Sequence, residues 1–265
     1  MATISVDELS HWNRAVTEAT EACHDERFPD TLIAAIRTLV PVESVLIGLE
    51  QREQAPTLLY ETGIPSHYRE RIIRRYYSRG YLLDPFCLAV ERGLSAGFYH
   101  LSEVAPDNFF TSEYYKTYYL AAGAVEDCYY ILDLSSEAKV SISLYNGLTT
   151  TPFDADQLAR LRTLEPMIAH LAHRHWRPRL PTPPSPPHGW RLQDAFLDFG
   201  REWLTERERE VCHLLLRGHS AKSSARELAI SPETIRMHRK NLYTKLGVSS
   251  QAELFALFID WLSAE

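Results

Sequence analysis

Residues 204–248 read LTEREREVCHLLLRGHSAKSSARELAISPETIRMHRKNLYTKLGV, and this stretch decides the fold of the C-terminal part of the chain. Thr205 followed by Glu208 is the capping-box pattern of a helix start, and Gly218 is the residue type that ends a helix in the left-handed conformation. Apolar residues recur at helical spacing between these two signals. We therefore expect one helix between Thr205 and Gly218.

Two further helix starts follow in the same stretch. Ser220 is placed to cap a second, short helix, and Ser231 with Pro232 directly after it is the pattern that begins a third. The third helix should turn inward the residues that recur every three or four positions, namely Ile235, His238, Leu242 and Leu246. Its outer face should then carry Arg236, Met237, Lys240 and Thr244.

Charge is distributed unevenly along the chain. The formal net charge of the whole chain is −7 at pH 7, yet residues 217–245 hold seven basic residues and two acidic ones. A local basic surface on an acidic protein is what a phosphate backbone selects, because counterion release supplies most nonspecific affinity for DNA. An ordinary solvated helix face would explain the charges alone, but not the caps, the turn and the apolar stripe together. The pattern therefore favours DNA binding.

The same residues closely resemble the LuxR-type helix-turn-helix family over about 60 residues at the C-terminus. The matching positions are Leu204, Thr205, Arg207, Glu208, Glu210, Val211, Gly218, Ser220, Lys222, Ala225, Leu228, Ile230, Ser231, Thr234, Ile235, His238, Lys245, Leu246, Gly247 and Val248. The pattern departs at Ala221, Ser223 and Ser224, where the family usually has a small polar residue, an acid and an isoleucine. These changes bear on the second helix and leave the third in place.

The resemblance implies that the third helix enters the major groove. The residues facing base edges would be Arg236, Met237 and Lys240, and those facing phosphates would be Lys222, Thr234, Arg239 and Lys245. The last segment, SQAELFALFIDWL, begins with a capping-box pattern at Ser250 and Glu253. By resemblance this segment is a dimerisation helix, and simple closure of a four-helix core is the alternative.

Composition limits the possible classes of protein. The chain has 265 residues, 45% of them hydrophobic and 11% aromatic, which fits two globular domains and argues against long disorder. No apolar run reaches membrane-spanning length and no signal peptide is recognisable at the start, so we expect a cytoplasmic protein without a membrane partner. The four cysteines are isolated from one another, which predicts free thiols.

The domain boundary lies in a proline-rich segment. The sequence RPRLPTPPSPPHG at 177–189 has no apolar periodicity and predicts a semi-rigid linker. We therefore expect a sensor domain at 1–176, a linker at 177–189 and a DNA-binding domain at 190–265.

The N-terminal domain has a mixed pattern. Helices are predicted at 6–23, 30–39, 66–79, 85–91, 112–122 and 154–176, and strands at 44–50, 57–62, 126–134 and 138–146. The predicted fold class is α+β: an α/β/α sensor sandwich with an antiparallel sheet, like PAS and GAF domains, followed by an all-α four-helix helix-turn-helix domain. Sheets of this kind commonly enclose one small-molecule cavity.

Tyrosines are concentrated between residues 60 and 130. Each one joins an apolar ring to a hydroxyl that needs a partner, so the group as a whole favours a ligand pocket, although packing is the simpler interpretation of any single tyrosine. Residues 67–86, HYRERIIRRYYSRGYLLDPF, also resemble the autoinducer-binding domains that precede LuxR-type readers, most strongly at Asp84-Pro85. The ligand-binding residues we expect are Tyr68, Tyr76, Tyr81, Asp84, Tyr99, Tyr115 and Tyr129.

In that family the aspartate accepts a hydrogen bond from the amide of an acyl-homoserine lactone, and tyrosine and tryptophan side chains shape the lactone end. Here the tryptophans are absent and Tyr99 stands near one of their places, so a different metabolite with an amide or ammonium group fits better. A helix cap before Pro85 explains Asp84 equally well.

Other classes of function lack their signatures. The sequence has no nucleophile elbow, no phosphate loop and no strand-helix alternation of a phosphorylated receiver. His170, His173 and His175 share one helix without carboxylate or cysteine company, so no metal, cofactor or enzymatic activity is expected.

Two functions remain from the sequence. The first is a ligand-responsive, dimeric transcriptional regulator whose partners are double-stranded DNA with an inverted repeat, a small-molecule effector and a second copy of the chain, with RNA polymerase a further candidate. The alternative is a DNA-binding regulator whose N-terminal domain is a ligand-independent dimerisation or protein-interaction module.

Overall fold

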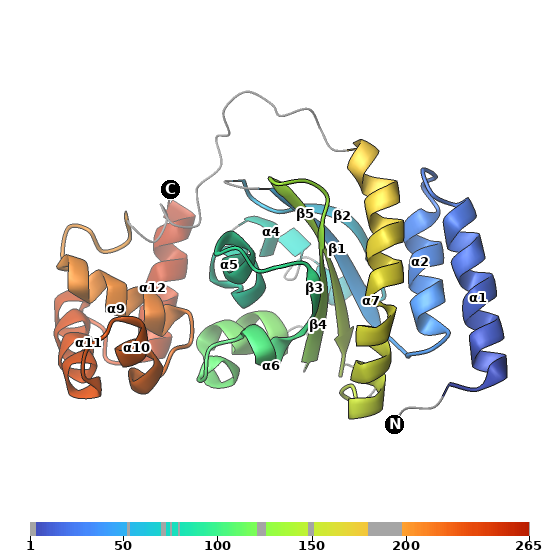
Figure 1. The fold of residues 1–265 in the computed structure, drawn as a ribbon. Helices are drawn as coiled ribbons and strands as arrows, with labels where there is room; N and C mark the ends of the chain where they lie inside the picture. The colour runs from blue at the N-terminus through green and yellow to red at the C-terminus, as the bar shows by residue number, and fades with distance from the viewer. Residues whose placement is uncertain are drawn as a thin grey trace.

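A computed structural model describes residues 4–51, 54–69, 73–74, 76–78, 80–120, 126–147, 151–179 and 198–264. The N-terminal part is an antiparallel sheet with helices on both faces, and the C-terminal part is entirely helical (Figure 1). This arrangement confirms the predicted fold class. The predicted linker at 177–189 falls mostly outside the described residues, and so does the start of the predicted DNA-binding domain.

The sheet contains five strands in the order β2-β1-β5-β4-β3. Their bounds are β1 Ser44–Gln51, β2 Thr57–Thr62, β3 Gly97–His100, β4 Glu126–Asp133 and β5 Ala138–Asn146. All neighbours pair antiparallel, and β5 lies at the centre with β1 on one side and β4 on the other. Because successive residues of a strand point to opposite sides, this register fixes which side chains share a face.

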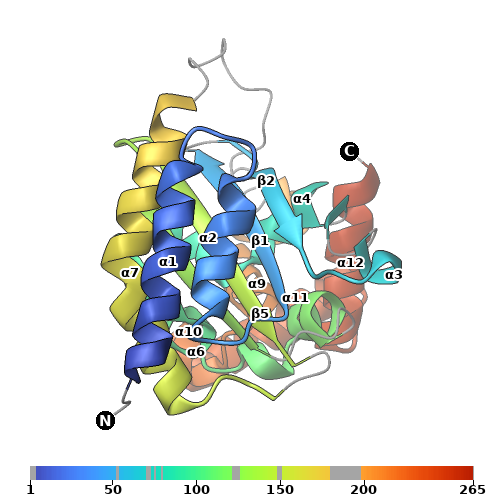
Figure 2. The same ribbon diagram turned by 90° about the vertical axis from the view of Figure 1, so that its right-hand side faces the viewer.

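One face of the sheet is apolar and forms a closed core. Its central side chains are Val45, Ile47, Leu49, Cys128, Tyr130, Leu132, Val140, Ile142 and Leu144. Three helices cover it, namely α1 (Val6–Glu21), α2 (Phe28–Arg37) and α7 (Ala155–Trp176), which lie side by side in Figure 2. Capping boxes begin α1 at Ser5 and α7 at Asp154. Burial of this apolar face stabilises the N-terminal part.

The opposite face of the sheet is polar although it is largely covered. We call it the polar face and define it by Glu50, Asp127, Tyr129, Ser141, Ser143 and Tyr145. The short elements on this side of the sheet are α3 (Ser66–Arg69), α4 (Tyr76–Ser78), η2 (Gly80–Leu83), α5 (Pro85–Glu91), α6 (Leu101–Val104), η3 (Phe109–Thr111) and the π-helical turn η4 (Tyr115–Tyr119). A buried surface made of hydroxyls and carboxylates is unusual for a core, so it marks the candidate ligand side.

The helical part follows the sequence signals closely. Its helices are α9 (Glu206–Leu216), α10 (Ala221–Glu227), α11 (Pro232–Leu246) and α12 (Gln251–Ala264). The side chains of Thr205, Ser220 and Ser231 cap the first three, as predicted. At Ser250 the predicted capping box is only half formed, because the Glu253 carboxylate accepts hydrogen bonds from Ser249 instead.

Residues just after α6 hold the helical part against the N-terminal part. The Asp107 carboxylate accepts hydrogen bonds from the Ser220 amide at 3.0 Å and from the hydroxyls of Ser220 and Ser223 at 2.7 and 2.6 Å. The Asn108 amide donates to the Gly218 carbonyl at 3.1 Å. Gly218 has a positive φ of 86°, and a Cβ there would lie 2.9 Å from the backbone of Phe109, so only glycine permits this approach.

One short strand was missed, and two predicted helices are described only in part. In the range predicted as a helix at 66–79, all described residues are helical, namely α3, residues 73–74 and α4, and the other residues lie outside the described ones. The helix predicted at 112–122 is helical over 113–120, where it contains the π-helix η4 whose tyrosines pack against Phe109, and residues 121–122 lie outside the described ones. Strand β3 was missed, because four residues are too few to show a period and only pairing with β4 defines them.

No helix in the described part of the chain is long and apolar enough to cross a membrane.

Candidate functional site

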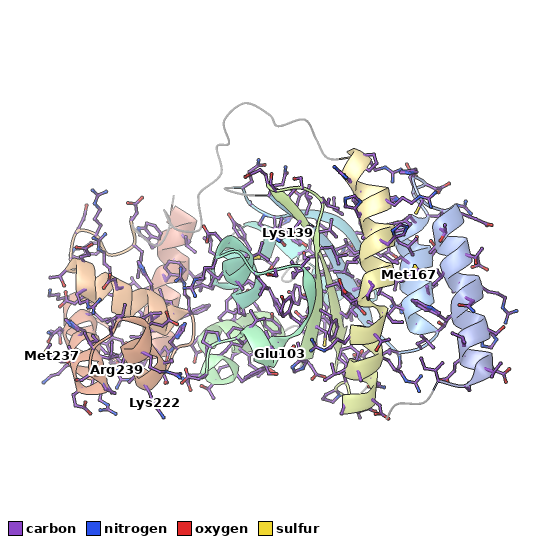
Figure 3. All side chains as sticks on the ribbon, viewed as in Figure 1. Glu103, Lys139, Met167, Lys222, Met237 and Arg239 are labelled. Atoms are coloured by element: carbon purple, nitrogen blue, oxygen red, sulfur yellow. The ribbon has the colours of Figure 1, made fainter. Side chains whose placement is uncertain are left out.

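Helix α11 presents a polar face to solvent. Ile235 and Leu242 are fully buried against the other helices, so Arg236, Met237 and Lys240 point outward. Met237 is 52% exposed, which is high for an apolar side chain and leaves it available to a partner. In Figure 3 Met237 lies at the edge of the helical part that is farthest from the sheet.

The other predicted DNA-binding residues are distributed around this face. Lys222 is exposed on α10, and Thr234 is half-buried at the start of α11, where its hydroxyl lies 3.0 Å from that of Ser231. Arg236 forms an ion pair with Glu233 at 2.8 Å, and both side chains are more than half exposed. An exposed pair one helical turn apart contributes little, so the guanidinium can exchange Glu233 for a base edge at small cost.

Lys245 is held differently. Its ammonium lies 2.6 Å from the carboxylate of Glu208, whose side chain is only 5% exposed. Burial acts to raise the pKa of Glu208, but the hydrogen bonds from Lys245 and Thr205 outweigh it and the pKa is lowered. Lys245 therefore joins the end of α11 to the start of α9, whatever contact it makes with DNA.

Asp84 lies at the centre of the polar side of the N-terminal part. It is 1% exposed, and one carboxylate oxygen accepts the amides of Phe86 and Cys87 at 2.7 and 3.2 Å, which caps α5. The other oxygen accepts the hydroxyls of Tyr76 at 3.1 Å and Tyr114 at 3.5 Å. Burial raises the pKa of Asp84 to about 6 despite these hydrogen bonds. The aspartate is thus both a helix cap and part of a tyrosine-lined cluster.

Two further carboxylates lie on the same side, on strands β1 and β4. Glu50 accepts the Ser141 hydroxyl at 3.0 Å and lies 3.9 Å from the Cys87 thiol. Its side chain keeps some accessible surface, yet its surroundings desolvate it enough to raise its pKa to about 7. Asp127 is completely buried, which raises its pKa well above the usual value. We call Glu50, Asp84 and Asp127 the carboxylate row.

Tyrosines surround the carboxylate row. The Tyr119 hydroxyl lies 3.5 Å from one oxygen of Asp127, and the hydroxyls of Tyr129 and Tyr145 also act to lower its pKa. The second oxygen of Asp127 is buried and has no hydrogen-bond partner among the residues that the structure describes. Tyr129 stacks on Phe86 with ring centroids 3.6 Å apart, which ties β4 to α5.

The structure brings some of the predicted ligand residues together and separates others. Tyr76 and Asp84 are bonded, while Tyr81 and Tyr129 are buried in the same cluster. Tyr115 is buried farther along, among Phe109, Phe110 and Tyr119. Tyr68 lies on α3 beside His67, and Tyr99 borders a cleft of about 440 Å³ that is also lined by Arg92 and Arg217.

The expected ligand residues did not include Glu50, Asp127 and Ser141, and Tyr114 and Tyr119 entered only as members of the tyrosine-rich stretch. Strand alternation was the available signal for the strand residues, because it places Asp127 and Tyr129 on one face of β4, and Ser141 and Tyr145 on one face of β5.

Comparison with known proteins identifies relatives of this chain. Residues 202–258 match the family described as bacterial regulatory proteins, luxR family. A protein of Aeromonas salmonicida, named as an HTH-type transcriptional regulator in the exeN 3′ region, is 33% identical over 186 residues, which is 68% of this chain and 94% of that protein. The transcriptional regulatory protein UhpA of Escherichia coli is 47% identical over 57 residues, covering 22% of this chain and 29% of UhpA.

The N-terminal fold also has a solved counterpart. The crystal structure of the VqsR LBD domain from Pseudomonas aeruginosa covers 64% of this chain and 98% of its own, with a TM-score of 0.55 and 23% identity. At this identity the likeness concerns the fold.

Proposed function

Because this chain belongs to the LuxR family of bacterial regulatory proteins, we propose that it is a dimeric, ligand-responsive transcriptional regulator that reads an inverted-repeat site through α11. The N-terminal part would bind a small molecule on the polar face of the sheet and bias how two helical domains sit on DNA.

The observation that supports DNA reading is the outer face of α11. Arg236 and Lys240 can donate to guanine acceptors and Met237 can contact a thymine methyl, while the exposed lysine and arginine at 222 and 239 are placed for phosphates. Every one of these side chains is exposed, and in Figure 3 the labelled ones lie away from the sheet. The docked arrangement of the two parts therefore leaves this face open to a duplex.

The observation that supports a ligand is the polar face. Asp84 and Asp127 are buried, and one oxygen of Asp127 has no partner among the described residues. A module used only for protein contact has no need of such a costly interior, because buried polar groups without partners reduce stability. The Asp84 carboxylate caps a helix, whereas within the described ranges Glu50 and Asp127 cap none and bond only side-chain hydroxyls and the Cys87 thiol.

The DNA half of the proposal is tested by site selection from random duplexes, followed by titration of the selected site. Arg236→Ala should cost about 1–3 kcal/mol and relax one base preference. Arg174→Ala, which removes an exposed arginine from α7, is the matched control and should leave binding unchanged. Equal affinity and selectivity of the two variants would exclude Arg236 as a base reader.

The ligand half is tested by thermal unfolding of the whole chain against acyl-homoserine lactones, amines and amino-acid derivatives. A ligand at 100 times its Kd adds about 2.7 kcal/mol if it binds only the folded form. A saturating rise with one chemical class supports the sensor, and its effect on Kd for the selected DNA gives the direction of regulation. No rise across the panel would favour the protein-interaction alternative.

Sedimentation of the free and DNA-bound chain tests the dimer.

A further inference from the structure

We propose that the polar face receives a linear organic amine with at least two protonated nitrogens, one lying against Glu50 and the other against Asp127. This inference rests on the ligand-responsive function proposed above and specifies the chemistry of the ligand. It departs from the neutral amide and lactone that the resemblance of the N-terminal domain implies.

The carboxylate row has no cationic partner within the part of the chain that the structure describes. None of the three members of the carboxylate row forms an ion pair with a lysine or arginine there. Lys139 stands opposite Glu50 in the register, but its ammonium bonds the carboxylate of Asp133 at the end of the sheet. Burying a carboxylate without a cation nearby is unfavourable, so a ligand that brings positive charge to Glu50 and Asp127 would be stabilised by both.

One carboxylate oxygen of Asp127 lacks a hydrogen-bond donor among the described residues. The side chain is 0% exposed and lies on the polar face, because its neighbours in the alternation, Tyr129 and Ile131, pack on that side. One of its oxygens accepts the Tyr119 hydroxyl, with those of Tyr129 and Tyr145 acting on the same carboxylate, while the other oxygen has no partner among the described residues. A protonated amine has three donors and no acceptor, which suits a site made of acceptors.

Glu50 and Asp127, the two ends of the carboxylate row, lie far apart on the sheet. Asp127 pairs with Tyr145 on β5 and Glu50 pairs with Lys139 on the same strand. Six residues along a strand span roughly 20 Å at about 3.3 Å each, so one compact ammonium cannot serve both ends. A chain of methylene groups between two or more nitrogens matches an elongated site with charge at each end.

Tyrosine side chains line the carboxylate row between its two ends. Tyr76, Tyr114 and Tyr119 lie along the row, and tyrosine rings accommodate both alkyl segments and cations on their faces. Tyr76 and Tyr145 are half-buried like Glu50, so the face keeps accessible surface beneath its covering helices. These contacts would favour an aliphatic amine over an inorganic divalent cation.

The test uses calorimetry and thermal unfolding of the full chain with spermidine as the probe. Triacetylspermidine, which has the same skeleton without the charges, and octanoyl-homoserine lactone are the neutral comparisons, and magnesium chloride at matched ionic strength controls for general attraction to an acidic protein. We expect a saturating rise in Tm with spermidine alone. Glu50→Gln and Asp127→Asn should each raise the Kd at least tenfold, while Asp133→Asn on the exposed end of β4 should not.

Each other result overturns the inference. A rise with octanoyl-homoserine lactone and none with spermidine would keep the sensor and reject the amine. Equal rises with spermidine and magnesium would mean nonspecific attraction. No rise with any of these compounds would reject the amine site, and the broader metabolite panel would then decide the proposed function separately.

A measurement without ligand checks the same premise. Burial disfavours the ionised form of Asp127, and Asp127→Asn keeps the shape of the side chain but cannot ionise, so the ligand-free Tm of the variant should fall less than that of the unmodified protein as the pH is raised from 4 to 8. Parallel pH profiles would mean that the protein already compensates Asp127, and that a ligand cation has no role there.

Discussion

Replacing Lys245 by methionine tests how much the link between α9 and α11 contributes to stability. The change keeps the aliphatic stem and removes the ammonium that lies 2.6 Å from Glu208. Glu208 stays 5% exposed at the start of α9, where the Thr205 amide at 2.9 Å is its remaining donor. The substitution therefore leaves a nearly buried carboxylate without a cationic partner.

The cost follows from burial. Removing one partner of a fully buried pair costs about 3–5 kcal/mol. The Lys245 side chain is 39% exposed, so water reaches the pair and the cost should fall to about 2 kcal/mol. For a domain of 60–100 residues, 1 kcal/mol shifts Tm by about 4–8 °C. Lys245→Met should accordingly lower the Tm of the helical part by about 8–16 °C.

The dependence on pH gives the sign of the effect. The pKa of Glu208 is lowered from 4.5, so its contribution is present above pH 4.5 and is lost as the pH falls through the lower folded value. The difference between Lys245→Met and the unmodified protein should therefore shrink in acid. The assay is urea unfolding followed by circular dichroism at pH 7 and below pH 4.

Lys240→Met is the matched control, because it removes an exposed ammonium from the same helix. Its effect on stability should lie within about 0.5 kcal/mol. Equal stability of the two variants would refute the reasoning. If Lys245 also contacts a phosphate, its variant should reduce the salt dependence of DNA binding at temperatures well below its Tm.

Three shorter predictions concern other parts of the chain. Ser223→Glu should place a second carboxylate against Asp107 and separate the two parts, which small-angle scattering would detect as a larger radius of gyration; an unchanged radius would show that this contact does not hold them. Since burial raises the pKa of Glu50 to about 7, stability should fall as the pH rises from about 4.5 to 7, and Glu50→Gln should remove about 2–3 kcal/mol of that fall in urea unfolding; parallel pH profiles would contradict this. Ser231→Ala should cost about 1 kcal/mol in thermal unfolding and Ser231→Gly only a few tenths, an order that would reverse if the hydroxyl did not cap α11.

The sequence predicted the helical domain well because its signals are local. The hydroxyl of Ser231, the proline at 232 and the left-handed Gly247 each act within one turn of the helix they begin or end. The polar face could not be predicted in this way. Glu50 and Ser141 are 91 residues apart and meet only through the pairing of β1 with β5. The residues that specify α11 are thus neighbours in sequence, whereas those of the ligand side are neighbours only in the sheet.

For Asp84, the local sequence predicted the role of the side chain but not its neighbours in space. The Asp-Pro pattern indicated a helix cap or a ligand contact, and the structure assigns the cap to one carboxylate oxygen and two tyrosine hydroxyls to the other. Nothing near Asp84 in the sequence indicated that Glu50 and Asp127 would lie on the same side.

The departures from the family pattern on α10 also have a structural counterpart. The Ser223 hydroxyl donates to Asp107 at 2.6 Å, where an acid would repel it. Ser224 is fully buried and its hydroxyl has no hydrogen-bond partner in the described part of the chain, which is consistent with a position where the family has an apolar residue. The departure at Ser223 thus serves the contact between the two parts, while nothing in the structure explains those at Ala221 and Ser224.

Helix α5 connects these two regions of the molecule. Its first turn is capped by Asp84 within the carboxylate row, and Leu88 and Ala89 line the cleft that Arg217 and His219 of the helical part also border. A ligand that competes for the Asp84 carboxylate would act on the cap of the same helix that borders the DNA-binding part. Because α5 has only seven residues, the loss of one cap affects a large share of its backbone hydrogen bonds. A short helix between the two regions is therefore better suited than a long one to relay occupancy of the polar face.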